Sequence, residues 1–534
     1  MKITSPLILL PGLCLATSIP AWGQVTEDLK LLASDGEQGD ALGYQAVGVG
    51  GSRVLLGSRA DGDLGGAAYL FDRATGQQLQ KFLPADAEPL DEFGSSAAID
   101  GDLGLVGAPA EGDEVNFLFD SGSVYVFDLD TGQQLFKLQA DAPESFERFG
   151  TSVAAAGGIA VVGVPRSNEQ GSKSGSVHVI DLSTGLHLFE LLASDGGDEW
   201  FFGDSVSIDG DRILVGAYGD AGNGKRSGSA YVFDALTGQE IRKLVPADNE
   251  ALDAFGDAVA IEGNIAVIGA YGDDDQALNA GAAYVFDIDT GTQLFKLFPG
   301  DPEDSDFFGT AVAISENRIV VGNERDDDNG NASGSAYIFD AATGAQLAKV
   351  LPSDGDVEDY FGISVGMGDG ALVVASPFDV DGGIRSGSAY VFELGGSNGV
   401  TYCGSDQNPN NASTIAIDTT DASSSSIQVS LSQGPANQFV YLLVGNGNGT
   451  VSQPPGAKGD LCVVGGSCLG RYDKDVGQIA ADGTFATDII QALSNPCAGG
   501  VTITPGATWN FQYWHRQPMG QPATFSEAIS VIFQ

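Results

Sequence analysis

The sequence predicts an all-β protein, a seven-bladed β-propeller of four-stranded blades followed by a small disulfide-containing β-sandwich. Three observations support the propeller. A phrase close to Gly-Ser-Ala-Tyr-Val-Phe-Asp occurs seven times, at a period of about 53 residues, and such periods are typical of propellers, solenoids and arrays. Each copy holds four short strand-like runs. Glycine is abundant, with 76 residues, as a chain with many tight turns requires.

Three short phrases recur in the same order and define the repeat. The copies of the first phrase start at Gly66, Gly122, Gly175, Gly228, Gly281, Gly334 and Gly387. A Phe-Gly or Leu-Gly pair precedes each copy, with its glycine at Gly43, Gly94, Gly150, Gly203, Gly256, Gly309 and Gly362. A Thr-Gly pair follows six of the copies, at Thr75, Thr131, Thr184, Thr237, Thr290 and Thr343.

The fifth copy illustrates the predicted blade. Its strand-like runs are Ala258–Ile261, Ile265–Gly269, Ala282–Phe286 and Gln293–Phe298. None of them has the apolar period of a helix, and short turns rich in glycine and polar residues separate the first from the second and the third from the fourth. Four strands repeated seven times predict a seven-bladed propeller.

The two ends of the array predict how the ring closes. The seventh copy lacks the fourth-strand phrase, whereas Asp28–Asp35 near the N-terminus matches the run Leu188–Asp195 of the third copy. We therefore expect the N-terminal run to complete the last blade, which removes the exposed sheet edges that an open array would leave.

The chain divides into four predicted parts. Residues 1–23 have the features of a secretory signal peptide, residues 24–394 form the propeller, residues 395–400 a linker and residues 401–534 the C-terminal β-sandwich. Outside the signal peptide the chain has four cysteines, whose even number predicts two disulfides with the pairing open. They are Cys403, Cys462, Cys468 and Cys497. The protein is therefore expected to be secreted and to remain outside the cell or on its surface.

The formal net charge is −48 at pH 7. This charge excludes nucleic acid as a natural partner, because phosphate binding requires Lys and Arg. No run of 18 apolar residues follows the signal peptide, so no membrane span is expected. The charge favours a cation or a basic protein surface as the partner, and the ligand itself, a protein or a glycan, stays unidentified.

Most of the acidity falls in two kinds of loop, which the antiparallel strand order places on one face. Carboxylates gathered there predict a Ca²⁺ site or a docking surface for a cationic partner; alternatively, the aspartates only form Asx turns and keep the surface soluble. The candidate metal ligands are Asp61, Asp63, Asp273, Asp274, Asp275, Asp326, Asp327, Asp328, Asp379 and Asp381. The longer loop of the second copy adds the apolar triplet Phe117, Leu118 and Phe119, which either contacts a partner or folds back on its own blade.

The run from Phe93-Gly94 to Val106-Gly107-Ala108-Pro109 resembles the FG-GAP repeat of integrin α-subunit propellers, in a variant found in secreted bacterial proteins. The resemblance covers about residues 26–394 and implies an extracellular propeller with an adhesive or ligand-binding use. The Ca²⁺ loop of integrin repeats is replaced by tight turns such as Asp100-Gly101-Asp102, so no integrin metal residue carries over. Residues 509–516 resemble a C-terminal module of secreted planctomycete-like proteins, which implies export.

No catalytic motif accompanies the repeats. The chain has three histidines, and His178 and His187 are expected to be framework residues because they stand within predicted strands. The expected function is extracellular binding or adhesion without catalysis. Two alternatives stay open. The run around Thr131-Gly132 resembles quinoprotein dehydrogenase repeats, although Phe136 stands where those repeats have Trp. The other alternative is a purely structural envelope or matrix protein.

Overall fold

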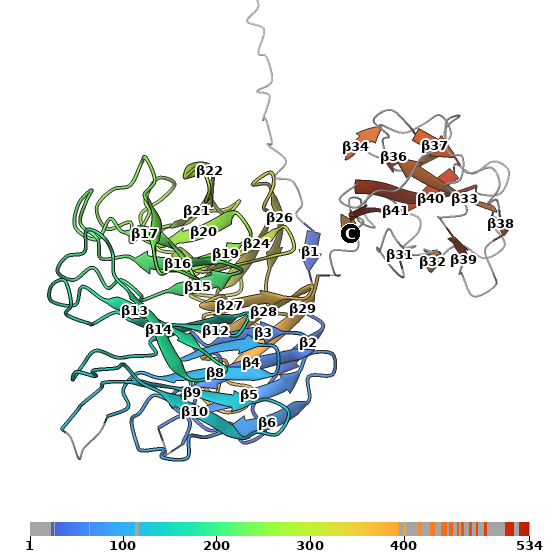
Figure 1. Cartoon of the computed structure of the whole chain (residues 1–534). Coiled ribbons are helices and arrows are strands. Elements are labelled where there is room, and N and C mark those ends of the chain that lie inside the picture. Colours follow the sequence, from blue (N-terminus) through green and yellow to red (C-terminus); the bar gives the residue numbers. More distant parts are fainter. Residues whose placement is uncertain are drawn as a thin grey trace, which may run out of the picture.

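The computed structural model describes residues 23–25, 27–62, 65–112 and 117–394, and in residues 400–534 it describes the backbone of separate strands. Between residues 23 and 394 the chain forms seven sheets that follow one another around a ring (Figure 1). Each has four antiparallel strands, and one of them gains a fifth strand at its outer edge. The predicted all-β, seven-bladed propeller is therefore confirmed. The predicted signal peptide lies outside the described residues except for Gly23, and the predicted metal ligand Asp63 lies outside them altogether.

Each blade runs from an inner first strand to an outer fourth strand. Blade 1 holds β3 (Val47–Gly50), β4 (Arg53–Ser58), β5 (Ala67–Asp72) and β6 (Gln78–Phe82), and blade 2 holds β7 (Ser96–Asp100), β8 (Leu103–Ala108), β9 (Ser123–Asp128) and β10 (Gln134–Leu138). Blade 3 holds β11 (Ser152–Ala156), β12 (Ile159–Val164), β13 (Ser176–Asp181) and β14 (Leu186–Leu191), and blade 4 holds β15 (Val206–Asp209), β16 (Arg212–Ala217), β17 (Ser229–Asp234) and β18 (Glu240–Leu244). Blade 5 holds β19 (Val259–Glu262), β20 (Ile265–Ala270), β21 (Ala282–Asp287) and β22 (Thr292–Leu297), and blade 6 holds β23 (Phe308–Ser315), β24 (Arg318–Asn323), β25 (Ser335–Asp340) and β26 (Gln346–Val350). Blade 7 holds β27 (Ser364–Gly368), β28 (Ala371–Ser376) and β29 (Ser388–Glu393), with β2 (Leu29–Leu31) as its outer strand.

The hydrophobic core lies between the blades. In β21 of blade 5, Tyr284 and Phe286 pack toward blade 4, whereas the alternating Val285 packs toward blade 6. Both faces of the middle strands are thus buried, which explains their continuous apolar sequences. The four predicted strands of this blade agree with the observed ones to within one residue at each end.

Successive blades are joined by a backbone seam. At the seam between blades 4 and 5, the amide of Phe255 donates to the carbonyl of Ser227 at 3.0 Å, and the amide of Ala254 donates to that of Arg226 at 3.0 Å. Gly228 and Phe255 form a parallel bridge, so close that a Cβ on Gly228 would lie 1.9 Å from the Phe255 carbonyl oxygen. Only glycine fits there, and the same glycine–phenylalanine bridge recurs at five other seams of the ring.

The ring closes through the N-terminal run, as predicted. β2 pairs antiparallel with β29, with Leu31 opposite Ala389. Leu31 is fully buried in a hydrophobic cluster that also contains Tyr69 of blade 1 and Val391 of blade 7. A further strand, β1 (Gly23–Val25), pairs parallel with β26 of blade 6 and was not predicted.

The last quarter of the chain contains further strands, arranged in three sheets of seven, three and two strands. They are β30 (Val400–Thr401), β31 (Thr414–Ile417), β32 (Gln428–Ser432), β33 (Phe439–Gly445), β34 (Asn448–Val451), β35 (Ala457–Lys458), β36 (Leu461–Val463), β37 (Leu469–Arg471), β38 (Gly477–Gln478), β39 (Phe485–Asp488), β40 (Thr508–Arg516) and β41 (Ala523–Ile532). The sandwich packing and the two disulfides stay predictions, because the side chains there lie outside the described residues. The part of the chain that is described contains no helix long and apolar enough to cross a membrane.

Truncating Leu31 to alanine tests the closure of the ring. The substitution leaves a cavity between the first and last blades and is expected to lower the free energy of unfolding by about 2–5 kcal/mol. Leu31→Ala is compared with Leu32→Ala, whose side chain is exposed, by thermal and urea unfolding of the full chain. Equal stability of the two variants would show that β2 does not close the ring.

Alanine at Gly228 tests the seam. Gly228 (φ 86) and Gly210 (φ 56) both have a positive φ, so alanine strains the backbone at either position. A Cβ at Gly210 meets nothing within 4 Å, which makes Gly210→Ala the control. We expect Gly228→Ala to lower the midpoint of thermal unfolding further than Gly210→Ala does, by roughly 5 °C or more, because the blades must also separate. Similar shifts would argue against the seam.

Candidate functional site

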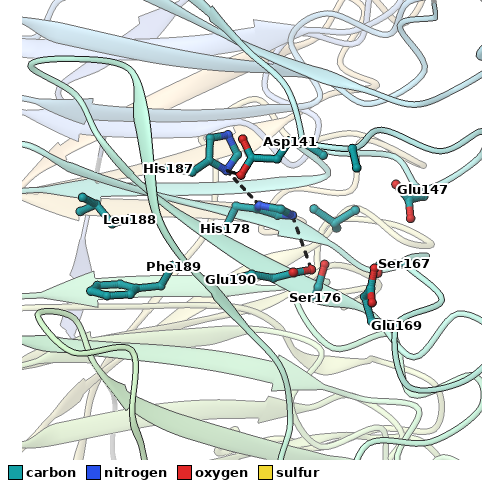
Figure 2. A pocket seen from close by; sticks show the side chains of 13 residues that line it. Asp141, Glu147, Ser167, Glu169, Ser176, His178, His187, Leu188, Phe189 and Glu190 are labelled. Atoms are coloured by element: carbon teal, nitrogen blue, oxygen red, sulfur yellow. Dashed lines mark hydrogen bonds and ion pairs between the residues drawn. The ribbon is translucent and has the colours of Figure 1, made fainter.

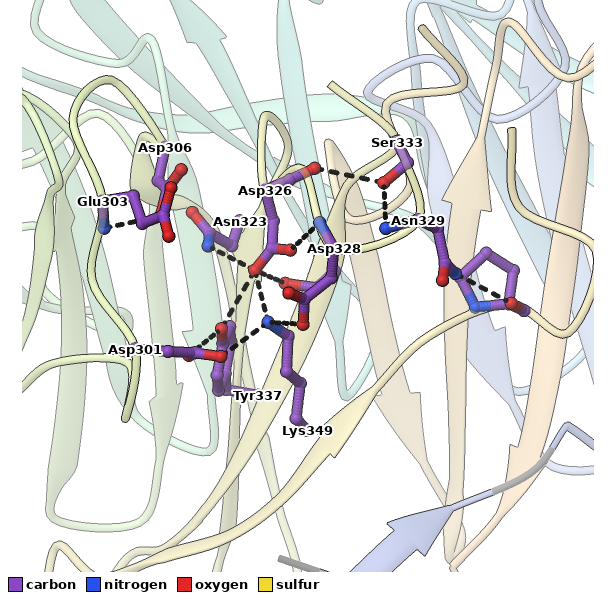
Figure 3. A network of polar contacts seen from close by, with 12 residues as sticks. Asp301, Glu303, Asp306, Asn323, Asp326, Asp328, Asn329, Ser333, Tyr337 and Lys349 are labelled. Carbon is purple, nitrogen blue, oxygen red and sulfur yellow. Dashed lines mark hydrogen bonds and ion pairs between the residues drawn. The ribbon is translucent and has the colours of Figure 1, made fainter. Parts of the chain in front are cut away.

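One face of the ring carries the loops that join the second and third strands of each blade, together with the loops that lead into each first strand. We call it the loop face. Each blade has one polar cluster there, and Figures 2 and 3 show those of blades 3 and 6. In blade 6 one lysine contacts Asp326, from the loop between the second and third strands, and Asp301, from the loop that leads into the first strand. The two acidic loops therefore do meet, as the strand order predicted.

The cluster of blade 6 surrounds a buried ammonium group. Lys349 Nζ lies 2.9 Å from Asp301, 2.7 Å from Asp326 and 2.6 Å from Asp328 (Figure 3). The hydroxyl of Tyr337 donates to Asp301 at 2.6 Å and to Asp326 at 3.0 Å, and the ammonium lies 5.2 Å from the centre of the Tyr337 ring. Three carboxylates, one phenol and one ammonium thus satisfy one another.

The same lysine cluster recurs in six of the seven blades. Its ammonium groups belong to Lys81, Lys137, Lys243, Lys296, Lys349 and, through the N-terminal strand, Lys30 in blade 7. Its tyrosines are Tyr69, Tyr125, Tyr231, Tyr284, Tyr337 and Tyr390. In blades 1 to 6 the fourth-strand residue of the cluster comes twelve positions after its third-strand residue. Lys349, for example, comes twelve positions after Tyr337. Blade 3 keeps this spacing but has His178 and Glu190 at the two positions.

The clusters shift the acidities of their members. Burial alone would raise the pKa of Asp301, but the hydrogen bonds from Tyr337 and Lys349 outweigh it and lower that pKa. Burial opposes the charge of Lys349 as well, and Asp326 and its neighbours nevertheless raise the lysine pKa. Asp306 lies behind the cluster. Burial raises its pKa to about 6, although the hydrogen bond that it accepts from the amide of Glu303 acts in the opposite direction. The inner carboxylates are thus held in place by compensating contacts.

The predicted metal ligands fall into three groups. Asp61, Asp273, Asp326 and Asp379 are buried and contact the lysine of their blade. Asp275, Asp328 and Asp381 contact the same ammonium groups from further out. Asp274 and Asp327 are exposed at the loop tips. In this arrangement the carboxylates do not fit Ca²⁺, which needs six to eight oxygen ligands around itself, because a lysine ammonium already lies between them.

Sequence reasoning missed the lysines. In blade 6 the lysine lies on β26, where half-buried, exposed and buried residues are mixed, so the strand pattern alone does not single it out. The constant spacing of twelve residues between tyrosine and lysine was the available signal.

Blade 3 departs from the other six and has an open pocket. Ser167 replaces the buried aspartate, His178 the tyrosine and Glu190 the lysine. The resulting pocket, of about 240 Å³, is lined by Asp141, Ala140, Ala142, Glu147, Val164, Ser167, Glu169, Ser176, His178, His187, Leu188, Phe189 and Glu190 (Figure 2). The two imidazole rings meet edge to face inside it, with an interplanar angle of 82°. His178 and His187, expected to be framework residues, therefore line a cavity.

The loop face also exposes large apolar side chains. Phe117 is 75% exposed and Phe119 is 51% exposed, and the ring of Phe119 stacks on that of Phe146 at 6.4 Å. The triplet that includes Leu118 therefore does not fold into its own blade. The exposed apolar residues of this face include Leu90, Phe117, Phe119, Phe146, Leu252, Leu278, Val357, Val380 and Ile384.

A second cavity, of about 310 Å³, lies on the axis of the ring and is lined by residues at the starts of the first strands. Asp204 and Asp257 face it, and burial raises the pKa of Asp204 to about 6. These two aspartates give the cavity an acidic lining.

A protein-family model with the description FG-GAP repeat matches the chain seven times, at residues 25–71, 77–127, 133–180, 189–233, 239–286, 292–339 and 345–392. The matches together cover more than half of the sequence. Nearly every one holds the fourth strand of one blade followed by the first three strands of the next, which is the offset that closes the ring. No curated protein matches this sequence.

Replacing Lys349 with methionine tests the lysine cluster. The variant keeps the aliphatic chain but leaves the buried Asp326 without its counter-ion, which is expected to cost about 3 kcal/mol of unfolding free energy at pH 7. In the wild type the lowered pKa of Asp301 contributes stability that is lost as the pH falls. In the variant the uncompensated carboxylates are relieved when they protonate. The difference should therefore shrink from pH 7 to pH 4.

The control for this experiment is Lys225→Met, which removes an exposed lysine from a loop of the same face. Urea unfolding of all three proteins is measured at both pH values. A cost for Lys349→Met that matches the control, or that does not change with pH, would contradict the role given to the ammonium.

Proposed function

The chain belongs to the FG-GAP repeat family, and on the evidence of its loop face we propose that it is a non-catalytic protein that binds a basic protein partner outside the cell. The family and the propeller fold are consistent with a binding or structural protein. The export is supported by the predicted signal peptide and by the even number of cysteines outside it. The choice of partner rests on the loop face.

The observation that carries this proposal is the exposed aromatic group of Phe117, Phe119 and Phe146. Soluble proteins seldom leave several large apolar side chains exposed side by side unless a partner covers them. Aromatic side chains dominate the binding energy of many protein interfaces. The longer loop of blade 2 presents Phe117 and Phe119 next to the loop that leads into blade 3, where Phe146 stacks on Phe119.

Charge defines the kind of partner. The net charge of −48 gives the molecule a strongly negative field that attracts basic surfaces and repels acidic ones. The lysine clusters neutralise part of the inner acidity, while Asp274 and Asp327 stay exposed at the loop tips. A partner with a basic rim around an apolar centre fits such a face. The contact should weaken with salt, since its charges are exposed.

A basic protein fits this face better than Ca²⁺ does. The lysine ammonium groups already contact the carboxylates that the sequence nominated as Ca²⁺ ligands, so an ion at those positions would have to displace them. The proposal therefore assigns no role to Ca²⁺ at the lysine clusters.

Serine substitutions on the two faces of the ring test the proposal. The full chain is immobilised and exposed to the proteins released by the cells that produce it, and captured proteins are identified by mass spectrometry. We expect a basic protein to be captured at low salt, and expect Phe117→Ser with Phe119→Ser to reduce its capture at least tenfold. The control is Leu186→Ser with Leu236→Ser. These leucines are 65% and 69% exposed and lie at the turns of the opposite face. Equal capture by both variants would contradict the proposal.

A further inference from the structure

Blade 3 lacks the cation that the other six polar clusters contain. Glu169 stands where Asp328 contacts Lys349 in blade 6, Ala142 stands at the position of Asp301 with Asp141 directly before it, and Glu190 replaces the lysine. Among the described residues that line the pocket there is no lysine or arginine. Burial and the charge of Glu169 raise the pKa of Glu190. Carboxylates thus line this pocket without the counter-ion that the equivalent groups have elsewhere.

Two imidazole rings meet in the same pocket. Nδ1 of His178 and Nδ1 of His187 lie 3.1 Å apart, and Nε2 of His187 lies 2.8 Å from the carbonyl oxygen of Gln139. Because a carbonyl only accepts, that Nε2 carries the proton, and Nδ1 of neutral His187 has a free lone pair. Since Nδ1 of His187 then accepts, the short contact between the two Nδ1 atoms places the proton of His178 on its own Nδ1.

We propose that this pocket binds a divalent transition-metal ion, with Zn²⁺ as the reference ion, through Nδ1 of His178 and Nδ1 of His187 and through the carboxylate of Asp141. Two nitrogens that each lie about 2.0–2.1 Å from one zinc ion are separated by roughly 3.0–3.4 Å, and the two Nδ1 atoms are already at that separation. Imidazole nitrogen with carboxylate oxygen suits Zn²⁺, Ni²⁺ or Cu²⁺, whereas Ca²⁺ and Mg²⁺ prefer oxygen alone.

The outer nitrogen of His187 has the partner that metal-bound histidines usually have, and the outer nitrogen of His178 lies near a carboxylate that can become one. A metal-ligating histidine donates its second N–H to a backbone carbonyl or a carboxylate. His187 does so to Gln139. When His178 binds the ion through Nδ1, its proton moves to Nε2, which lies 3.9 Å from a carboxylate oxygen of Glu190 (Figure 2). The charge count of the ring does not change, so binding needs no release of a proton by His178.

Asp141 completes the site by a small movement. No group of three or more His, Cys, Asp and Glu side chains in the described residues already stands in metal-binding geometry. The Asp141 carboxylate lies 3.9 Å from Nδ1 of His187, and its side chain is 81% exposed. Because it is free to rotate, it can close the remaining gap once the ion is held by the two rings. Water completes the coordination from the open side of the pocket.

The neighbouring blades supply a matched control variant. The triple substitution Ser167→Asp, His178→Tyr and Glu190→Lys gives blade 3 the buried aspartate, the tyrosine and the lysine of the cluster, while Ala142 stays at the position of Asp301. The new lysine is expected to contact the introduced aspartate and Glu169, as lysines of other blades contact the equivalent groups. The variant leaves the C-terminal cysteines and His515 untouched, so any Zn²⁺ bound there is retained. A second variant, His187→Gln, removes one proposed ligand and changes little else.

Isothermal titration of the full chain with ZnCl₂ tests the proposal. We expect one site per chain with a dissociation constant in the micromolar range or below, together with a rise in the midpoint of thermal unfolding. His187→Gln should weaken this site at least tenfold, and the triple variant should lose it while unfolding at the same temperature or higher without metal. Co²⁺ bound in the pocket should give visible bands without the strong near-ultraviolet absorption of thiolate ligands.

Three results would overturn the proposal. The first is Zn²⁺ binding that is equal in the wild type and both variants, which would place the metal outside the pocket. The second is thiolate-type absorption of Co²⁺ that persists in the triple variant, with no other bands lost. The third is binding of methylammonium, but not of Zn²⁺, by the wild type, which would make the pocket a receptor for an alkylammonium group such as a partner's lysine.

Discussion

The close approach of two backbones at each seam is the constraint on which the rest of the structure depends. The glycine that ends the loop between the second and third strands of one blade lies against the Phe-Gly backbone of the next blade, with no room for a Cβ. The buried phenylalanine then fixes the depth at which the following first strand starts. Because six seams share this bridge and Gly387 lies similarly close to Leu42 at the seventh, the loops of both kinds arrive on one face at equivalent positions. The polar clusters recur around the ring for that reason.

Placing so many carboxylates on one face has an electrostatic consequence that the fold must meet. A buried aspartate without a counter-ion costs several kcal/mol, and the ring buries one in nearly every blade. The ammonium group of a lysine on the fourth strand offsets this cost. It contacts the aspartates of both acidic loops and lies beside the tyrosine of the third strand. Blade 7 is informative, because Lys30 from the N-terminal run reaches Asp354 and Asp379 from the far end of the propeller sequence. The closure of the ring is therefore electrostatic as well as hydrophobic.

Local pattern was enough to predict the fold. Glycine positions, turn residues and apolar runs determine the strands of blade 5 to within a residue, and the missing strand at Phe392 had its counterpart at Leu29–Leu31. The polar clusters were harder, because their members are remote in sequence and their partnership depends on distances between strands. From the sequence alone Lys349 cannot be distinguished from a surface lysine, because its partners Asp301 and Asp326 are remote in sequence. For the same reason the sequence predicted that His178 and His187 are framework residues. It shows two histidines nine residues apart, and only the pairing of their strands brings the two rings together.

Blade 3 shows that a repeat can exchange one self-consistent polar cluster for another. Loss of the lysine alone would leave a buried aspartate unpaired, and loss of the aspartate alone would leave a lysine among fewer partners. In blade 3 the aspartate, the tyrosine and the lysine are all replaced, by Ser167, His178 and Glu190, and His187 joins them from the neighbouring strand. Three changes at positions that contact one another remove the internal cation without leaving its buried partner behind. What remains is a pocket lined by imidazole nitrogens and carboxylate oxygens, in a ring whose six other clusters each contain a lysine.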